Sequence, residues 1–189
     1  MKKFILTIAM IFASSVIASA QQCKVQGLVQ YKFNDYVGYK IDAGAEIGVI
    51  SSENAKKLGF NKKDWEDYDR LSKDYIKYLE VKSDPEITDV NLFLQLLGVK
   101  FTNKEKGLLD SLSSKCLSQH LEISSNYEYI ELVDASGKYA LTLPYGEYYI
   151  FAKSKNRERA LVLELTGRIL MEEIKIDKPT KIVSFDFDY

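Results

Sequence analysis

Few side chains in this 189-residue sequence are of the types that carry catalysis or bind metals. It contains two cysteines, Cys23 and Cys116, and a single histidine, His120. Cys116 and His120 are four residues apart, so a helix would place both on one face, as a zinc site or a nucleophile pair requires. No third ligand or orienting acid follows at a matching spacing. We therefore predict no catalytic residue, no metal site and no cofactor, and we expect His120 to complement a helix C-terminus.

The two cysteines could instead pair with each other. Exported proteins can keep a disulfide, because their compartment is oxidising. One pairing, Cys23 with Cys116, is open to this chain, and two free thiols are the alternative. The sequence does not decide between them.

Carboxylates are the more numerous chemical groups. Asp64 and Asp67 stand among further acids and basic residues on a predicted helix, residues 62–82. Such mixed charge is typical of a solvated helix face with local ion pairs. The alternative is a small extracytoplasmic hydrolase that uses carboxylates at the junction of sandwich and insert, such as Asp64 or Asp67, as general acid or base.

Aromatic residues offer a different chemistry, that of binding. The chain has 13 tyrosines and one tryptophan, and such rings supply large amphipathic contact areas. Most of them fall at positions expected to pack in a core. Four are our candidate contact residues, two in the loop that enters the second strand and two on the first long helix: Tyr36, Tyr39, Trp65 and Tyr68.

The first twenty residues, MKKFILTIAMIFASSVIASA, have the pattern of a signal peptide. Lys2 and Lys3 form a positive start, a short apolar run follows, and Ala18-Ser19-Ala20 supplies small residues at the cleavage site. The apolar run is short for a membrane span. We therefore expect an extracytoplasmic protein, periplasmic or secreted, with no membrane span after cleavage.

The charge of the mature chain argues against nucleic acid as a partner. Removing Lys2 and Lys3 from the 26 basic residues leaves 24 against 27 acidic residues, a formal charge of −3. Proteins that bind nucleic acid neutralise phosphates with an excess of lysine and arginine. A partner at the cell envelope, either protein or carbohydrate, fits this composition better.

Strand patterns occupy both ends of the mature chain. Residues 23–33 alternate apolar and polar side chains, as a half-buried strand does, and residues 45–50 form a short apolar run. After residue 126 the alternation returns and continues to Tyr189, with turns at Asp134–Gly137 and Pro144–Gly146 and a further strand at residues 160–165. About seven short strands indicate an antiparallel sandwich.

Helical patterns fill the middle of the chain. A short pattern begins at Ser52, and Asn61 caps the helix of residues 62–82. Asp84-Pro85 predicts the start of a helix that ends at Gly98. Thr102 and Glu105 form a capping box that opens a further helix to about Leu121. We therefore expect a three- or four-helix block, residues 52–121, inserted into one domain of residues 21–189.

The strand motifs resemble those of the carboxypeptidase regulatory-like family, a transthyretin-like (prealbumin-type) β-sandwich. The resemblance is carried by VQGLV, by GAEIGV and by DASGKYALTLPYGEYYIFAKS, and it covers residues 24–50 and 127–189. Such domains mostly serve as binding or spacer modules.

Together with the signal peptide, the resemblance implies an exported, non-enzymatic binding or scaffold module. The helical insert lies outside the resemblance, and we expect it to meet a protein or glycan partner. The alternatives are the hydrolase described above and a structural subunit of a surface assembly.

Overall fold

The computed structural model describes residues 22–34, 36–98, 101–156 and 168–188. The predicted signal peptide and the predicted strand at residues 160–165 lie outside these ranges. The strands are β1 (Gln22–Asn34), β2 (Gly38–Ile41), β3 (Glu46–Ser51), β4 (Tyr129–Leu132), β5 (Lys138–Pro144), β6 (Gly146–Lys153), β7 (Ile169–Ile176), β8 (Thr180–Ile182) and β9 (Phe185–Phe187). The helices are α2 (Ser52–Lys57), α3 (Lys62–Ser83), α4 (Val90–Leu96) and α5 (Asn103–Ser124).

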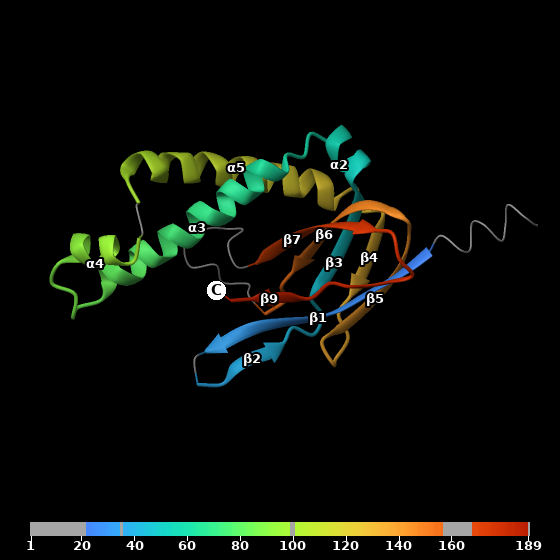
Figure 1. Cartoon of the computed structure of the whole chain (residues 1–189), viewed down its shortest axis with the longest axis horizontal. Coiled ribbons are helices and arrows are strands. Elements are labelled where there is room, and N and C mark those ends of the chain that lie inside the picture. The colour runs from blue at the N-terminus through green and yellow to red at the C-terminus, as the bar shows by residue number, and fades with distance from the viewer. Residues whose placement is uncertain (1–21, 35, 99–100, 157–167, 189) are drawn as a thin grey trace, which may run out of the picture.

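The strands form two sheets (Figure 1). One sheet has the order β2-β1-β5, with β8 and β9 also paired to β1, and the other has the order β4-β3-β6-β7. The pairs are antiparallel except that β8 and β9 run parallel to β1. The predicted fold class, mainly β with a helical insertion, is confirmed. The parallel pairs and the nine strands of the described ranges differ from the predicted antiparallel sandwich of about seven.

The inner faces of the two sheets share one core. Alternate residues of β1, β5 and β9 meet alternate residues of β3, β6 and β7, and the members include Val25, Leu143, Phe187, Ile47 and Ile150. In β9 the alternation is confirmed, because Phe185 and Phe187 are buried while Asp186 is exposed.

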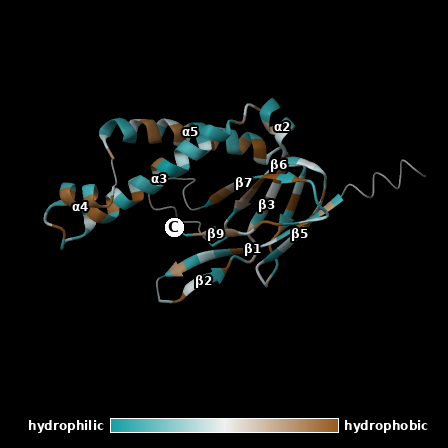
Figure 2. Ribbon diagram, in the orientation of Figure 1, coloured by the Kyte–Doolittle hydropathy of each residue, from teal (hydrophilic) through white to brown (hydrophobic). Residues whose placement is uncertain are grey.

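A second core lies between the helices and the outer face of the β4-β3-β6-β7 sheet. Ile50, Tyr149 and Phe151 of β3 and β6 pack there against side chains of α3 and α5, among them Trp65, Tyr68, Leu71, Leu109, Cys116 and Ile123. The molecule therefore has three layers, sheet on sheet on helices, with the polar helix faces turned outward (Figure 2). The β4-β3-β6-β7 sheet is the middle layer, and we call it the middle sheet. It carries apolar side chains on both faces, as expected of a sheet that is covered on both.

Local caps fix most helix ends where the sequence predicts them. The capping box of Thr102 and Glu105 is present at α5, and the Asn61 side chain accepts a hydrogen bond from the Lys63 amide at 3.1 Å at α3. The start of α4 was predicted five residues too early. Asp84 accepts a hydrogen bond from the Glu86 amide within a turn, and Asp89 is the residue that caps α4, at 3.0 Å from the Leu92 amide.

Candidate functional site

The β1–β2 hairpin projects beyond the two-sheet core (Figure 1). Its strands pair antiparallel, with Lys32 opposite Tyr39 and Asn34 opposite Gly38. The Asn34 side chain accepts hydrogen bonds from the amides of Tyr36 and Val37, at 3.0 and 2.7 Å, and so fixes the turn. At the base, Ile41 packs over Gly137, where an added Cβ would lie 2.3 Å from the Ile41 Cγ2. The hairpin is therefore held at both its tip and its base.

Large apolar side chains are exposed on both faces and at the tip of this hairpin. Tyr36 is wholly exposed, and the others are between 44% and 55% exposed: Phe33, Val37, Tyr39 and Ile41. We name these five residues the hairpin patch. A half-buried strand normally presents apolar side chains to the core and polar ones to water. The hairpin departs from that pattern, because its apolar side chains are exposed on both faces.

Polar groups hold two of these rings in place. The Tyr39 hydroxyl donates a hydrogen bond to Asp188, which follows β9, and this bond raises the pKa of Tyr39. The Lys40 ammonium lies 3.4 Å from the centroid of the Phe33 ring, a cation–π contact. The rings thus present fixed faces, with charged groups beside them.

Trp65 and Tyr68, the other two candidate contact residues, lie elsewhere. Their side chains are only 6% and 4% exposed and belong to the core between the helices and the middle sheet. The Trp65 ring meets Phe151 edge to face, with the centroids 5.7 Å apart. The structure therefore does not bring these two rings together with Tyr36 and Tyr39, and their burial places them in the packing of the insert.

Both cysteines are free thiols, so the alternative of a disulfide between Cys23 and Cys116 is wrong. Cys23 lies in the core between the sheets, whereas Cys116 lies in the core between the helices and the middle sheet. The middle sheet separates these two cores. Burial raises the pKa of both thiols, that of Cys116 to about 12, and the carboxylate of Asp64 adds to the effect there.

His120 shares the environment of Cys116 but does not activate it. Burial, with a smaller contribution from Lys153, lowers the pKa of His120 to about 4. A neutral imidazole next to a protonated thiol is not an activated nucleophile pair. In the described ranges there is also no group of three or more His, Cys, Asp or Glu side chains that could hold a metal ion.

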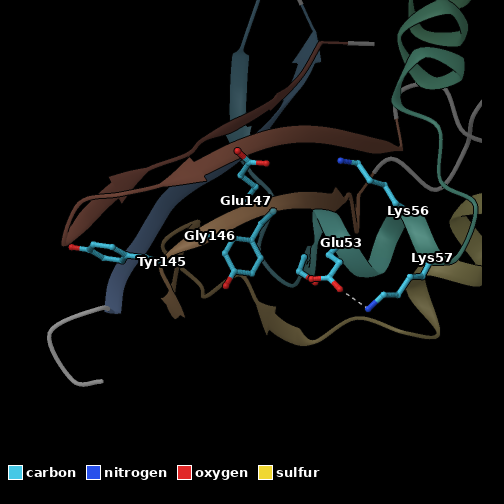
Figure 3. Close-up of a pocket in the computed structure, with 8 residues that line it drawn as sticks. Glu53, Lys56, Lys57, Tyr145, Gly146 and Glu147 are labelled. Carbon is cyan, nitrogen blue, oxygen red and sulfur yellow. Dashed lines mark ion pairs between the residues drawn. The ribbon is translucent and has the colours of Figure 1, made fainter. Parts of the chain in front are cut away.

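A cleft of about 710 Å³ lies between α2 and the start of β6 (Figure 3). Glu53 forms an ion pair with Lys57 at 2.7 Å, and its carboxylate points away from that of Glu147. Paired acid–base catalysis requires two carboxyl groups directed at one bond. These two glutamates are not arranged in that way.

A second cleft, of about 330 Å³, lies between α3 and the strands β7 and β9. Trp65 and Tyr68 contribute to its lining. So do five acids from the helical layer and the strands, namely Glu66, Asp69, Glu172, Asp186 and Asp188, but Asp64 and Asp67, the two examples given for the hydrolase alternative, do not. Asp64 instead pairs with Lys115 at 2.7 Å, and Asp67 pairs with Arg70 at 3.4 Å. Both carboxylates therefore serve ion pairs of the helical layer.

Sequence comparison assigns no family. No protein-family model matches the chain, and no curated protein is similar enough in sequence to match. The transthyretin-like resemblance stays a prediction.

Structural comparison finds distant likenesses. A Pseudomonas aeruginosa protein provisionally assigned to carbohydrate binding aligns over 88% of both chains, with a TM-score of 0.40 and 8% identity. Two structures of the Streptococcus pneumoniae pilus protein RrgB align with TM-scores of 0.31, at 15% and 12% identity. They cover 87% and 86% of this chain, which spans 30% and 40% of theirs. Likeness at this level carries no functional argument.

Sequence reasoning missed three members of the hairpin patch, namely Phe33, Val37 and Ile41. The sequence carries no signal for them, because apolar residues stand at alternate positions both in residues 29–33 and in residues 37–41. That is the pattern of a strand with one buried face.

Proposed function

We propose that this protein is an exported, non-enzymatic binding module that meets a protein or glycan partner at the cell envelope through the hairpin patch. The observation that carries the proposal is the full exposure of Tyr36 at the tip of an arm whose other large apolar side chains are also exposed. The two-sheet core acts as the scaffold. The proposed contact differs from the predicted one, since it moves from the helical insert to the hairpin.

Leaving these rings in water costs free energy, which a partner recovers by covering them. Interfaces concentrate their binding energy in a few tyrosine, tryptophan and arginine side chains that become desolvated. Tyr39 and Phe33 are already oriented by Asp188 and Lys40, so little side-chain entropy is lost when a partner covers them. Tyr36, whose backbone is fixed by Asn34, supplies the most exposed ring.

The first prediction is that Tyr36→Ser combined with Tyr39→Ser lowers binding to isolated envelope at least tenfold. Loss of two anchor rings in an interface costs at least ~1.4 kcal/mol, which corresponds to that factor. The measurement is the amount of labelled protein bound to envelope over a concentration series. Tyr36 is wholly exposed, so the thermal unfolding midpoint of the variant should fall by no more than about 5 °C, the cost of losing the hydrogen bond from Tyr39 to Asp188.

Leu121→Ser is the matched control, because Leu121 is 59% exposed but lies on α5. It should bind as the wild type does. Treating the envelope with protease or with periodate separates the two partner classes, since only one treatment should abolish binding. Equal binding by the double variant and the wild type would refute the proposed function.

A further inference from the structure

The cleft between α3 and the strands β7 and β9 has a negatively charged lining. Five carboxylates and one ammonium group line it, which gives a formal charge of −4. The ammonium group is that of Lys73, which pairs with Asp69 at 2.7 Å. Glu172 and Asp186 have no hydrogen bond or ion pair within the described ranges. The cleft therefore holds two carboxylates that no group of the described chain pairs with.

Aromatic rings form the inner wall of the same cleft. They belong to four side chains that are between 0% and 6% exposed: Trp65, Tyr68, Phe185 and Phe187. The indole Nε1 of Trp65 is buried and donates no hydrogen bond within the described ranges. Buried N–H groups are nearly always paired, and an unpaired one costs free energy. A ligand that brings an acceptor as well as positive charge therefore suits this cleft.

The carboxylates of the cleft are too dispersed for a metal ion. No group of three or more His, Cys, Asp or Glu side chains in the described ranges could hold one. A cation that pairs with acids on both walls therefore has to be extended. An arginine guanidinium meets this requirement, because it spreads five N–H donors over a planar fork and also stacks on aromatic rings. A lysine ammonium is instead a compact, strongly hydrated point charge.

The cleft adjoins the hairpin patch. Asp188 lines the cleft and accepts the hydrogen bond from the Tyr39 hydroxyl. Asp186 lies opposite Gln30 of β1, in the parallel pair of β1 with β9. A partner that covers Tyr39 would therefore reach the cleft.

We propose that the cleft binds an arginine side chain of the protein that the hairpin patch meets. The guanidinium pairs with Glu172 and Asp186 and lies against the rings of the inner wall. A peptide segment also brings main-chain carbonyl oxygens, which are acceptors for the Trp65 N–H. A neutral glycan would leave the charge of the lining uncompensated. The inference rests on the proposed function for the owner of the arginine, and it selects protein over glycan.

The size of the cleft agrees with a single side chain. Ligand pockets span roughly 300–1,000 Å³. This cleft, of about 330 Å³, lies at the lower end of that range. It therefore suits one arginine residue better than a larger ligand.

Fluorescence of Trp65, the single tryptophan of the chain, measures occupation of the cleft. The probe is the peptide acetyl-Gly-Arg-Gly-amide, whose only charge is the guanidinium. Its addition to the protein should give a saturable change in emission, and calorimetry repeats the titration independently. The same peptide with citrulline, the uncharged analogue of arginine, should bind about tenfold more weakly or worse. Sodium chloride at about 1 M should also weaken binding of the arginine peptide, because the Debye length falls to about 3 Å.

Glu172→Gln combined with Asp186→Asn should lower the affinity for the arginine peptide by about tenfold or more, and it should also weaken binding to isolated envelope. Both side chains are exposed, so the thermal unfolding midpoint should stay in place. Glu122→Gln combined with Glu147→Gln is the matched control, because it removes two exposed carboxylates that do not line the cleft. It should bind peptide and envelope as the wild type does.

Failure of the arginine peptide to bind by either method would overturn the inference. So would equal affinity for the arginine and citrulline peptides, or a double variant that binds peptide or envelope as the wild type does. A response of Trp65 emission to maltose but not to the peptide would also overturn it, since the cleft would then take a glycan.

The two proposals can fail separately. Tyr36 does not line the cleft, so Tyr36→Ser should bind the arginine peptide as the wild type does. Failure of the proposed function shows in the envelope assay of the Tyr36→Ser, Tyr39→Ser variant, whereas failure of this inference shows in the peptide titration.

Discussion

The imidazole of His120 lies between the helical layer and the middle sheet, with its ring centroid 6.2 Å from that of Trp65 and 6.0 Å from that of Phe151. The sequence predicts that this residue complements the end of a helix. Its side chain is only 6% exposed, and burial decides its protonation instead. The positive charge of Lys153 also disfavours the imidazolium.

This burial predicts a pH dependence of stability. The pKa of His120 is about 4 in the folded chain against an ordinary value of 6.5. Between these two pH values the imidazole is therefore protonated in the unfolded chain and neutral in the folded chain. The free energy of unfolding should therefore fall as the pH falls from about 6.5 to about 4, by up to ~3 kcal/mol from this residue. Below about pH 4 its contribution should not change further.

Urea unfolding of the wild type and of His120→Phe across pH 7.5 to 4 measures the effect. Carboxylates titrate in both proteins, so the difference between the two curves isolates His120. The variant should lose less stability than the wild type as the pH falls. Parallel curves would contradict the prediction.

At the scale of elements, the close approach of β1 to the connection between β8 and β9 depends on Gly27. A Cβ at this position would lie 1.6 Å from the Val183 carbonyl oxygen and 2.9 Å from the Tyr139 ring. That carbonyl oxygen also accepts a hydrogen bond from the Tyr139 hydroxyl at 2.7 Å. Glycine in a strand marks such close backbone approaches.

Gly27→Ala should therefore lower the free energy of unfolding by at least ~3 kcal/mol, because the backbone of β1 and that of the β8–β9 connection would have to separate. Gly107→Ala is the matched control. Gly107 lies in α5 with no atom within 4 Å of an added Cβ, so alanine there should raise stability by up to ~1 kcal/mol. Chemical denaturation of both variants gives the comparison, and a Gly27→Ala protein as stable as the wild type would contradict this account.

At the scale of the molecule, the helical block leaves and re-enters the sheet at neighbouring points. Val49 near the end of β3 pairs with Tyr129 at the start of β4, so a short turn could join these two strands. The block nevertheless covers Ile50, Tyr149 and Phe151 on the outer face of the middle sheet. Its removal would expose these three side chains to water.

We predict that replacing residues 52–126 with a four-residue turn yields a protein that aggregates. The same deletion combined with Ile50→Thr, Tyr149→Thr and Phe151→Thr should be soluble and retain strand structure. The outer face of the middle sheet would then expose polar side chains in place of these three apolar ones. Size-exclusion chromatography and far-ultraviolet circular dichroism distinguish the two. A soluble, monomeric deletion without the three substitutions would show that the helices are not needed to cover the sheet.

None of the described helices has the length and hydropathy to cross a lipid bilayer.

The sequence alone determined the features that depend on neighbours along the chain. The capping box at Thr102, the turn at Asp134–Gly137 and the alternation in β9 all follow from hydrogen bonds or periodicity over a few residues. These local signals were sufficient for the fold class.

Tertiary structure alone decided which side chains are covered. Trp65 and Tyr36 are both aromatic candidates in the sequence, yet one is 6% exposed and the other wholly exposed. The sequence allows Cys23 and Cys116 to pair, but the middle sheet lies between the two cores in which they are buried. Exposure and separation depend on which distant element packs against a residue, and a pattern read over a few neighbours carries no information about that packing.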